Sequence, residues 1–321
     1  MKRNILLLFT FFACITVQGQ TPVRLVDLRS EHLDRPIGLD NPVPRLSWRI
    51  EDGRQGAVQT SWRIVVDEDS LNVVNGCGRM WDSGKNDSRN QLVAYAGKKL
   101  QPFTRYYWKV ICSDMEYKET ASPVSYFETG MMGMQHWQGA WIGDGKDIHY
   151  GPAPYFRKEF KTGKKVKSAR AYIAAAGLYE LYINGEKIGD HCLAPLYTRF
   201  DRRNLYVAYD VTSQLQNGDN AIGVLLGNGW YNHQSKAVWD FDRAPWRNRP
   251  TFCLDLRITY TDGSVETIPT DLSWRTASGA ITFNSIYTGE HYDARLEQKG
   301  WSTPEFDDSK WRGVAYRSVP S

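Results

Sequence analysis

The sequence carries very little net charge for its size. Its 40 Lys and Arg residues nearly balance its 36 Asp and Glu residues, which leaves a formal charge of +4. A protein that binds nucleic acid through phosphate contacts needs a concentrated basic face. The densest basic stretch, 161–170, is short and falls between expected strands, so we interpret it as a solvated loop. The composition therefore argues against a nucleic-acid partner.

Cysteine is scarce, and its spacing fits no metal or redox motif. Beyond Cys14 the chain has Cys77, Cys112, Cys192 and Cys253, and no Cys-x-x-Cys occurs. We expect these four to be buried small residues first and disulfide partners second, and four cysteines allow three pairings. The six scattered histidines suggest no zinc site. No EF-hand calcium loop is present either.

Only one long apolar run occurs, and it stands at the N-terminus. A basic pair precedes a predominantly apolar run at 5–17, and compact residues at 17 and 19 suit cleavage after Gly19. The run is too short to span a bilayer, so we predict a signal peptide at 1–19 and a secreted or periplasmic protein. The rival is an outer-membrane lipoprotein attached at Cys14, but hydrophobic residues follow Cys14 and argue against it. No other segment is apolar enough to be transmembrane.

Sustained helical periodicity is also absent, whereas aromatic residues are abundant. They make up 13% of the chain, with 12 Trp and 18 Tyr. Short alternating runs separated by turn signals predict strands. Only 211–215 looks briefly helical, capped by Asp210 or Thr212. The expected strands are 44–50, 61–66, 105–112, 124–127, 153–160, 168–174, 177–183, 205–209, 220–226, 251–260 and 264–269.

This pattern predicts an all-β protein of two domains. We expect an immunoglobulin- or fibronectin-like β-sandwich at 21–130, a linker at 131–142, and a jelly-roll β-sandwich at 143–321. Asn184-Gly185 and Asp262-Gly263 predict hairpin turns, because these residue types tolerate positive φ.

Several of these segments, taken in order, resemble the N-terminal region of bacterial α-L-rhamnosidases of the glycoside hydrolase family 78 type. The fibronectin-type module of that family is matched by 40–48 (DNPVPRLSW), 81–84 (WDSG) and 106–110 (YYWKV). Its sugar-binding domain is matched by 182–190 (YINGEKIGD), 193–198 (LAPLYT), 226–231 (LGNGWY), 290–295 (EHYDAR) and 300–301 (GW). The closing 306–311 (FDDSKW) is shared with galactose-binding-like jelly rolls.

The resemblance also implies what this chain does not contain. In that family the hydrolytic acids lie in an (α/α)6 barrel that follows these domains, and the sequence stops at Ser321, before any such barrel. No position can therefore receive the family's catalytic acids. We expect the chain not to be catalytic by itself, and a catalytic partner domain is implied.

A long loop, 228–247, gathers candidate ligand-binding residues. Aromatic rings in such a loop can stack on the apolar C–H face of a sugar, and neighbouring polar groups can bind its hydroxyls. The alternative is that the rings only seal the end of the sandwich. The expected sugar contacts in the loop are Asn228, Trp230, Tyr231, Trp239, Asp242 and Trp246.

Further candidates follow from the resemblance. The related domains can bind L-rhamnose with help from calcium, so calcium is a possible cofactor, with Asn184 and Asn228 sharing the ion and the sugar. The alternative for Asn184 is a hairpin turn without a ligand. Tyr197, Asp201 and Glu290 are additional candidates for sugar contact.

Three functions are compatible with these features. The first is non-catalytic binding of terminal L-rhamnose or a related sugar, in a rhamnose-containing polysaccharide or glycoside, near a catalytic partner. The second is a glycosidase whose acids come from the pairs Asp240 and Asp242, Glu290 and Asp293, or Asp307 and Asp308. We interpret those pairs as turns, caps and salt bridges. The third is a scaffold without a ligand.

Overall fold

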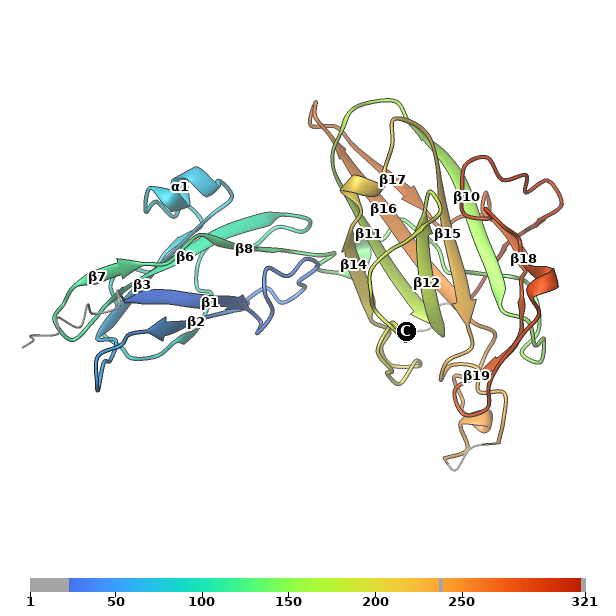
Figure 1. Ribbon diagram of the computed structural model, residues 1–321, viewed down its shortest axis with the longest axis horizontal. Helices are drawn as coiled ribbons and strands as arrows, with labels where there is room; N and C mark the ends of the chain where they lie inside the picture. Colours follow the sequence, from blue (N-terminus) through green and yellow to red (C-terminus); the bar gives the residue numbers. More distant parts are fainter. Residues whose placement is uncertain (1–22, 237–238, 319–321) are drawn as a thin grey trace, which may run out of the picture. The chain divides into compact units, whose positions relative to one another are not determined.

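A computed structural model describes residues 23–236 and 239–318, so the expected signal peptide lies outside the described residues. The chain divides into two compact units (Figure 1). The first comprises the described residues up to 36 together with 43–99 and 105–127. The second comprises 37–42, 100–104 and the described residues from 128 onward. Both units consist of β-sheets, which confirms the predicted fold class.

The first unit is a sandwich of a three-stranded sheet, β1-β2-β5, and a five-stranded sheet, β4-β3-β6-β7 with β8 beside β6. Its one helix, α1, begins after Asp69, whose carboxylate accepts a hydrogen bond from the Leu71 amide (2.8 Å). The sequence did not reveal α1 because five residues are too few to establish a period. The elements are β1 Arg24–Ser30, β2 Arg45–Glu51, β3 Ser61–Asp67, α1 Ser70–Val74, β4 Trp81–Asp82, β5 Leu92–Ala94, β6 Arg105–Ser113, β7 Glu119–Ala121 and β8 Ser125–Glu128.

The second unit pairs two six-stranded sheets. One has the order β13-β12-β15-β10-β18-β21; the other has the order β14-β11-β16-β9-β22, with β17 beside β16, and β19 and β20 form a separate hairpin. The strands are β9 Ile142–Gly143, β10 Pro154–Thr162, β11 Val166–Ala176, β12 Leu178–Ile183, β13 Glu186–Lys187, β14 Tyr206–Asp210, β15 Gly218–Gly227, β16 Thr251–Tyr260, β17 Val265–Pro269, β18 Arg275–Ser278, β19 Ile281–Ser285, β20 Gly289–Tyr292, β21 Arg312–Gly313 and β22 Ala315–Tyr316. Four 3-10 helices connect them: η1 Met134–His136, η2 Thr212–Gln214, η3 Phe241–Arg243 and η4 Ala294–Leu296.

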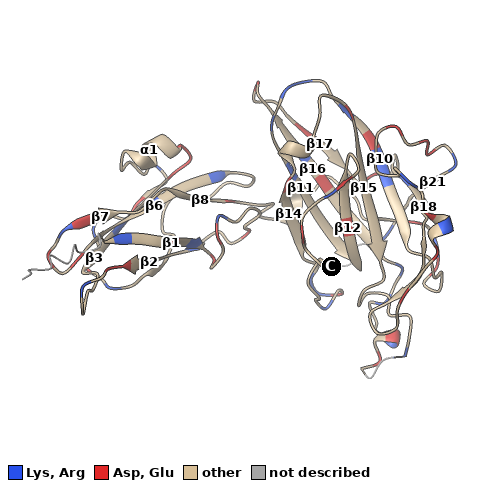
Figure 2. Cartoon of the chain, in the orientation of Figure 1, with Lys and Arg blue, Asp and Glu red and all other residues tan. Residues whose placement is uncertain are grey.

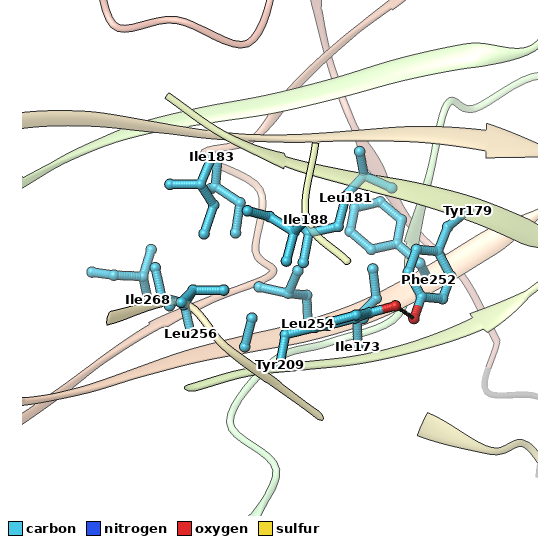
Figure 3. Packing of buried hydrophobic residues seen from close by; sticks show 14 of the residues in the cluster. Ile173, Tyr179, Leu181, Ile183, Ile188, Tyr209, Phe252, Leu254, Leu256 and Ile268 are labelled. Carbon is cyan, nitrogen blue, oxygen red and sulfur yellow. Dashed lines mark hydrogen bonds between the residues drawn. The ribbon is translucent and has the colours of Figure 1, made fainter. Parts of the chain in front are cut away.

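The core of the second unit lies between these two sheets. Alternate residues of β12 point inward and meet the inward residues of β16, such as Leu254 and Leu256 (Figure 3). The Tyr179 and Tyr209 hydroxyls, both buried, share a hydrogen bond of 3.0 Å. Because the side chains of a strand alternate between its two faces, the remaining residues of β12 are left on the outer face of the sheet.

Residues 161–170 correct one sequence interpretation. They do not form a solvated loop, because Lys161 and Thr162 end β10 and 166–170 begin β11. Arg170 is buried, and its guanidinium pairs with the Glu128 carboxylate at 2.7 and 3.0 Å. In Figure 2, Lys and Arg as well as Asp and Glu are scattered over the strands and loops of each unit.

The four cysteines of the described chain are all free thiols. Cys112 and Cys253 are buried, as expected, whereas Cys77 and Cys192 are exposed and correct that expectation. Burial raises the pKa of Cys112 and that of Cys253 to about 12. Among the described residues, no helix has the length and apolar character that spanning a bilayer requires.

Candidate functional site

One face of the sheet formed by β12, β15 and β10 makes the floor of a cavity. The outward residues of β12 are Leu178, Glu180 and Tyr182, since the residues between them enter the core. Strand register places Leu225 opposite both Tyr155 and Glu180, so these three side chains lie in one row across the sheet. The row brings an aromatic ring, an aliphatic side chain and a carboxylate together from three separate parts of the sequence.

The Trp301 indole, the main ring of the cavity wall, lies on a second row of the sheet. Gly223 lies opposite Tyr182, and a Cβ atom added to Gly223 would come within 2.5 Å of the Trp301 indole. The absence of a side chain at 223 therefore lets Trp301 lie directly on the sheet. The indole stacks on Tyr155 with centroids 4.5 Å apart and meets Tyr182 edge-on at 5.2 Å. Trp311 continues the stack, 6.3 Å from Tyr155.

A buried arginine fixes the segment that carries this indole. Arg157, on β10, has no solvent-exposed surface and donates hydrogen bonds to the Trp301 carbonyl (2.9 Å) and the Thr303 carbonyl (2.8 Å). Its guanidinium also pairs with the carboxylates of Glu159 (2.8 Å) and Asp308. A buried cation is tolerated when it is paired and fully hydrogen-bonded, as here. The wall is therefore held by main-chain as well as side-chain contacts.

The hairpin of β19 and β20 covers the other side of the cavity. Asn284, only 7% exposed, accepts a hydrogen bond from the Asn228 amide on its Oδ1 (2.7 Å). Its main-chain carbonyl accepts the Asn228 side-chain amide (3.0 Å). The Asn284 Nδ2 is buried and has no hydrogen-bond partner among the described residues. Asn284 lines the cavity, although its Nδ2 atom is itself buried.

The cavity has a volume of about 630 Å³, within the usual range of small-molecule sites. Burial tends to raise the pKa of Glu180, but hydrogen bonds from Lys187 and from the Tyr182 hydroxyl (2.6 Å) outweigh it and lower that pKa. Two carboxylates, Glu180 and Glu290, belong to the described residues that line the cavity, and the Lys187 ammonium of β13 pairs with the first of them. The lining residues that offer rings or polar groups are Tyr155, Tyr179, Glu180, Tyr182, Asn284, Ser285, Glu290, Tyr292 and Trp301.

A further cavity of the second unit offers less to a polar ligand. Its volume is about 650 Å³, and Trp137, Trp141, Tyr206 and Cys253 are among the residues that line it. The Tyr206 hydroxyl is already engaged with the Asp40 carboxylate at 2.7 Å. We therefore take the cavity over β12, β15 and β10 as the candidate site.

The structure brings most of the predicted rings together. The ring centroid of Tyr197 lies 5.9 Å from that of Trp230 and 6.0 Å from that of Phe241, although these residues come from two loops. Phe241 also contacts Trp239 (6.1 Å) and Trp246 (6.4 Å). Among the described residues between β15 and β16, η3 is the one regular element, in agreement with the predicted long loop. These rings do not line the cavity, but Gly229 at the base of their loop does.

Tyr231 has turned inward, unlike the other rings of the loop. It is only 5% exposed and packs against Phe200 with ring centroids 5.1 Å apart. Burial raises its pKa to about 12. For Tyr231 the alternative to sugar contact therefore applies: its ring seals the end of the sandwich.

The two asparagines predicted to share calcium lie too far apart to do so. The Asn184 amide donates to the Ala221 carbonyl (2.9 Å), whereas Asn228 follows the other end of β15. Seven residues of extended strand separate these ends, on the order of 20 Å. Each side-chain oxygen is also engaged, since Asn184 accepts the Ala221 amide (2.8 Å) and Asn228 accepts the Asn232 side chain (3.1 Å). The predicted pair does not fit one ion.

The remaining predicted residues lie in different surroundings. Asp201 forms an ion pair with Arg199 at 2.8 and 3.0 Å. Asp242 has one buried carboxylate oxygen without a hydrogen-bond partner among the described residues. Glu290, on β20, lines the cavity and is the single predicted site residue that does so.

The paired carboxylates make structural contacts. Asp293 pairs with Arg295 (2.7 Å), Asp307 accepts the Ser309 amide (3.0 Å), and Asp308 pairs with Arg157. Asp240 precedes the 3-10 helix η3, so Asp240 and Asp242 do not share a strand face. These contacts are the salt bridges and turns that the sequence suggested.

Sequence reasoning missed most of the cavity, including Tyr155, Glu180, Tyr182, Asn284 and Trp301. The alternation at 178–183 could have indicated which residues face outward from β12. It could not have indicated that Tyr155 and Trp301 meet them, because that depends on which strands are neighbours.

Known protein families match both units. A model of the Rha78A-like N-terminal immunoglobulin domain matches residues 25–133. A model of the α-L-rhamnosidase N-terminal domain matches residues 164–321.

Similar proteins match nearly the whole chain. An α-L-rhamnosidase of Formosa agariphila is 34% identical, over 99% of this chain and 36% of its own length. The solved α-L-rhamnosidase structure from Dictyoglumus thermophilum matches with a TM-score of 0.85 and 39% identity, over 92% of this chain and 34% of that one. The Aspergillus terreus enzyme has a TM-score of 0.83 and 30% identity, over 93% and 34%. The chain thus spans about a third of the length of these relatives. It carries two N-terminal domains of the α-L-rhamnosidase family, the immunoglobulin domain followed by the rhamnosidase N-terminal domain.

Proposed function

We propose that the second unit binds a neutral sugar, terminal L-rhamnose or a related deoxy sugar, in the cavity over β12, β15 and β10 without cleaving it. The observation that carries the proposal is the row of Tyr155, Leu225 and Glu180 beside the Trp301 indole. An aromatic and aliphatic surface next to a carboxylate suits a ligand with an apolar face and several hydroxyls.

The polar groups of the cavity match a hydroxyl-rich ligand. Glu180 and Glu290 can accept hydrogen bonds from sugar hydroxyls. Leu178 and Leu225 offer apolar contact to a ring face or to the methyl group of a deoxy sugar. Lys187 pairs with Glu180, but the Glu290 carboxylate would still repel an acidic sugar, so we expect uronic acids to bind more weakly than neutral sugars.

Binding without cleavage is supported by the state of Glu180. A glycosidase needs a carboxylic acid whose pKa is raised so that it can donate a proton near neutral pH. The pKa of Glu180 is lowered instead, because hydrogen bonds from Lys187 and Tyr182 outweigh the effect of burial. We therefore propose an accessory role, in which this region holds the sugar near a catalytic domain like those of the longer relatives.

The proposed binding does not involve calcium. Asn184 and Asn228 stand at opposite ends of β15, and the described residues contain no group of three or more His, Cys, Asp or Glu side chains arranged to hold a metal. Secretion, which the leader at 1–19 supports, is also part of the proposal. N-terminal sequencing of protein recovered from the periplasm or medium would test it.

The direct test is calorimetric titration of the mature protein with L-rhamnose, with calcium and then with chelator, beside an assay on an aryl α-L-rhamnoside. We expect saturable binding, unchanged by chelator, and no turnover. Glu180→Gln should weaken binding about ten-fold or more, through the loss of a charged acceptor. Glu186→Gln, in the neighbouring strand β13 and exposed, is the matched control and should bind normally.

Each result of this experiment decides something. Turnover that survives purification would replace the binding role with catalysis. Normal binding by the Glu180 variant would move the site away from the cavity. Neither binding nor turnover would leave a scaffold without a ligand.

A further inference from the structure

Three segments that line the cavity lead along the chain into aromatic rings. Gly229 and Ile286 line the cavity, and the next residue after each of them, Trp230 and Tyr287, carries a ring. These two rings meet edge-on with centroids 5.4 Å apart. Leu193 also lines the cavity and begins the loop that leads to Tyr197. The chain thus connects the cavity to a second group of side chains.

We call this second group the aromatic platform. The described part of the loop between β15 and β16, which carries four of its rings, projects from the end of the second unit beside β19 (Figure 1). Trp239 is 72% exposed, Tyr287 is 52% exposed and Tyr197 is 46% exposed. Scattered exposed rings are normal, but rings that gather at one place indicate an interaction site. The platform consists of Tyr197, Trp230, Trp239, Phe241, Trp246 and Tyr287.

Buried polar atoms lie beneath these rings. His233 is fully buried; its ring lies parallel to Trp230, with centroids 6.5 Å apart, and meets Tyr287 edge-on at 5.2 Å. The Nδ1 atom of His233 and the Oδ1 atom of Asp242 lack hydrogen-bond partners among the described residues. Because both atoms are buried, a ligand would meet the exposed edges and faces of the rings above them first.

We infer that the ligand of this region is an oligosaccharide, with its terminal sugar in the cavity and the following sugars on the aromatic platform. This inference rests on the proposed function of the cavity. Sugar rings present alternating C–H faces and hydroxyl edges along a chain, which suits exposed rings on adaptable loops. The cavity then selects the terminal sugar, and the platform adds affinity for the chain behind it.

The test compares ligand lengths on one protein. The mature chain is titrated calorimetrically with L-rhamnose and with a linear rhamnosyl trisaccharide. We expect the trisaccharide to bind about ten-fold more tightly, the size that one or two added ring contacts would give. Trp239→Ala should abolish most of this gain and leave the affinity for L-rhamnose unchanged. Its ring contact is Phe241 at 6.1 Å, so the substitution should not affect folding.

Tyr117→Ala is the matched control, because Tyr117 is an exposed ring of the first unit, 75% exposed. It should leave the affinities for both ligands unchanged. Equal affinities for L-rhamnose and the trisaccharide would overturn the inference and leave the proposed function intact. A length gain that survives both Trp239→Ala and Tyr197→Ala would also overturn it, because the chain would then lie elsewhere. Absence of binding by either ligand would remove the proposed function itself.

Discussion

The cavity wall and the aromatic platform are both rich in rings, yet they hold those rings in different ways. Tyr155 stands on a central strand, and Trp301 is fixed by a stack and by hydrogen bonds from the buried Arg157. The platform rings come from loops and meet one another edge-on or tilted, at 5.3 to 6.4 Å. The wall is thus preorganised for one shape, whereas the platform can adapt to several. We therefore expect the cavity wall to select the terminal sugar and the platform to accept several arrangements of the sugars that follow it.

The largest effect is expected from a substitution of Arg157, the residue that fixes the cavity wall. Arg157→Met leaves Glu159 and Asp308 without their cation, and it frees two carbonyls of the 301–303 segment. The two carboxylates are partly exposed, so the main cost comes from the two carbonyls that lose their donor, about 1–3 kcal/mol of unfolding free energy for each. Chemical denaturation should show this loss, together with loss of sugar binding.

The control for this change is Arg24→Met, which removes an exposed pair with Glu51. It should cost less than about 1 kcal/mol, because solvent screens exposed pairs. If the two substitutions cost the same, the wall is not held by Arg157.

A smaller change to the wall is Gly223→Ala. The added methyl group would lie 2.5 Å from the Trp301 ring and would push it off the sheet, at a cost of about 1–3 kcal/mol. Gly313→Ala in β21 of the same sheet meets nothing within 4 Å and should be nearly neutral. Thermal unfolding measures both effects. Retention of full sugar affinity by Gly223→Ala would mean that the indole position is not needed.

The charge in the cavity predicts a pH dependence. The folded pKa of Glu180 lies below its usual value of 4.5, so the ionised carboxylate stabilises the folded state above that pH. This contribution should fall as the pH drops from 4.5 through the lowered pKa. Wild type should therefore melt higher than Glu180→Gln at pH 6 to 7, and the difference should shrink towards pH 3. A difference that stays constant with pH would contradict the ionised state of Glu180.

The smallest effect on stability is expected for the platform. Trp239→Ala removes a ring that is mostly in solvent, so the unfolding free energy should change by no more than about 0.5 kcal/mol. Denaturant titration of this variant beside the Arg157 variant would sharpen the contrast between the two groups of rings. A loss of more than about 2 kcal/mol would show that Trp239 packs as a core residue.

The sequence predicted many of the longer strands because their signals are local, but it missed β1, β18, β19 and β20. Alternation and turn dipeptides located β2, β6 and β16, and Asn184-Gly185 indeed forms the turn between β12 and β13. The positive φ of both turn residues, 50° and 85°, is the conformation that these residue types tolerate. The rings of 228–247 were found for the same reason, since they are neighbours in the sequence.

The cavity could not be predicted in this way because its parts are distant in the sequence. Tyr155, Leu225 and Glu180 meet only because β15 lies between β10 and β12. Such an order depends on long-range pairing, which no local pattern specifies. For the same reason Asn184 and Asn228 looked alike as candidates, although the register places them at opposite ends of one strand.

The positions of the thiols make it possible to follow the opening of the two units separately. Among the described residues, the first unit contains the exposed Cys77 and the buried Cys112, and the second unit contains the exposed Cys192 and the buried Cys253. A thiol reagent at neutral pH should modify the exposed pair at once and reach each buried thiol only when its own unit opens. The order in which Cys112 and Cys253 become labelled would therefore show which of the two sandwiches opens first. The native chain serves for this, and no cysteine has to be introduced.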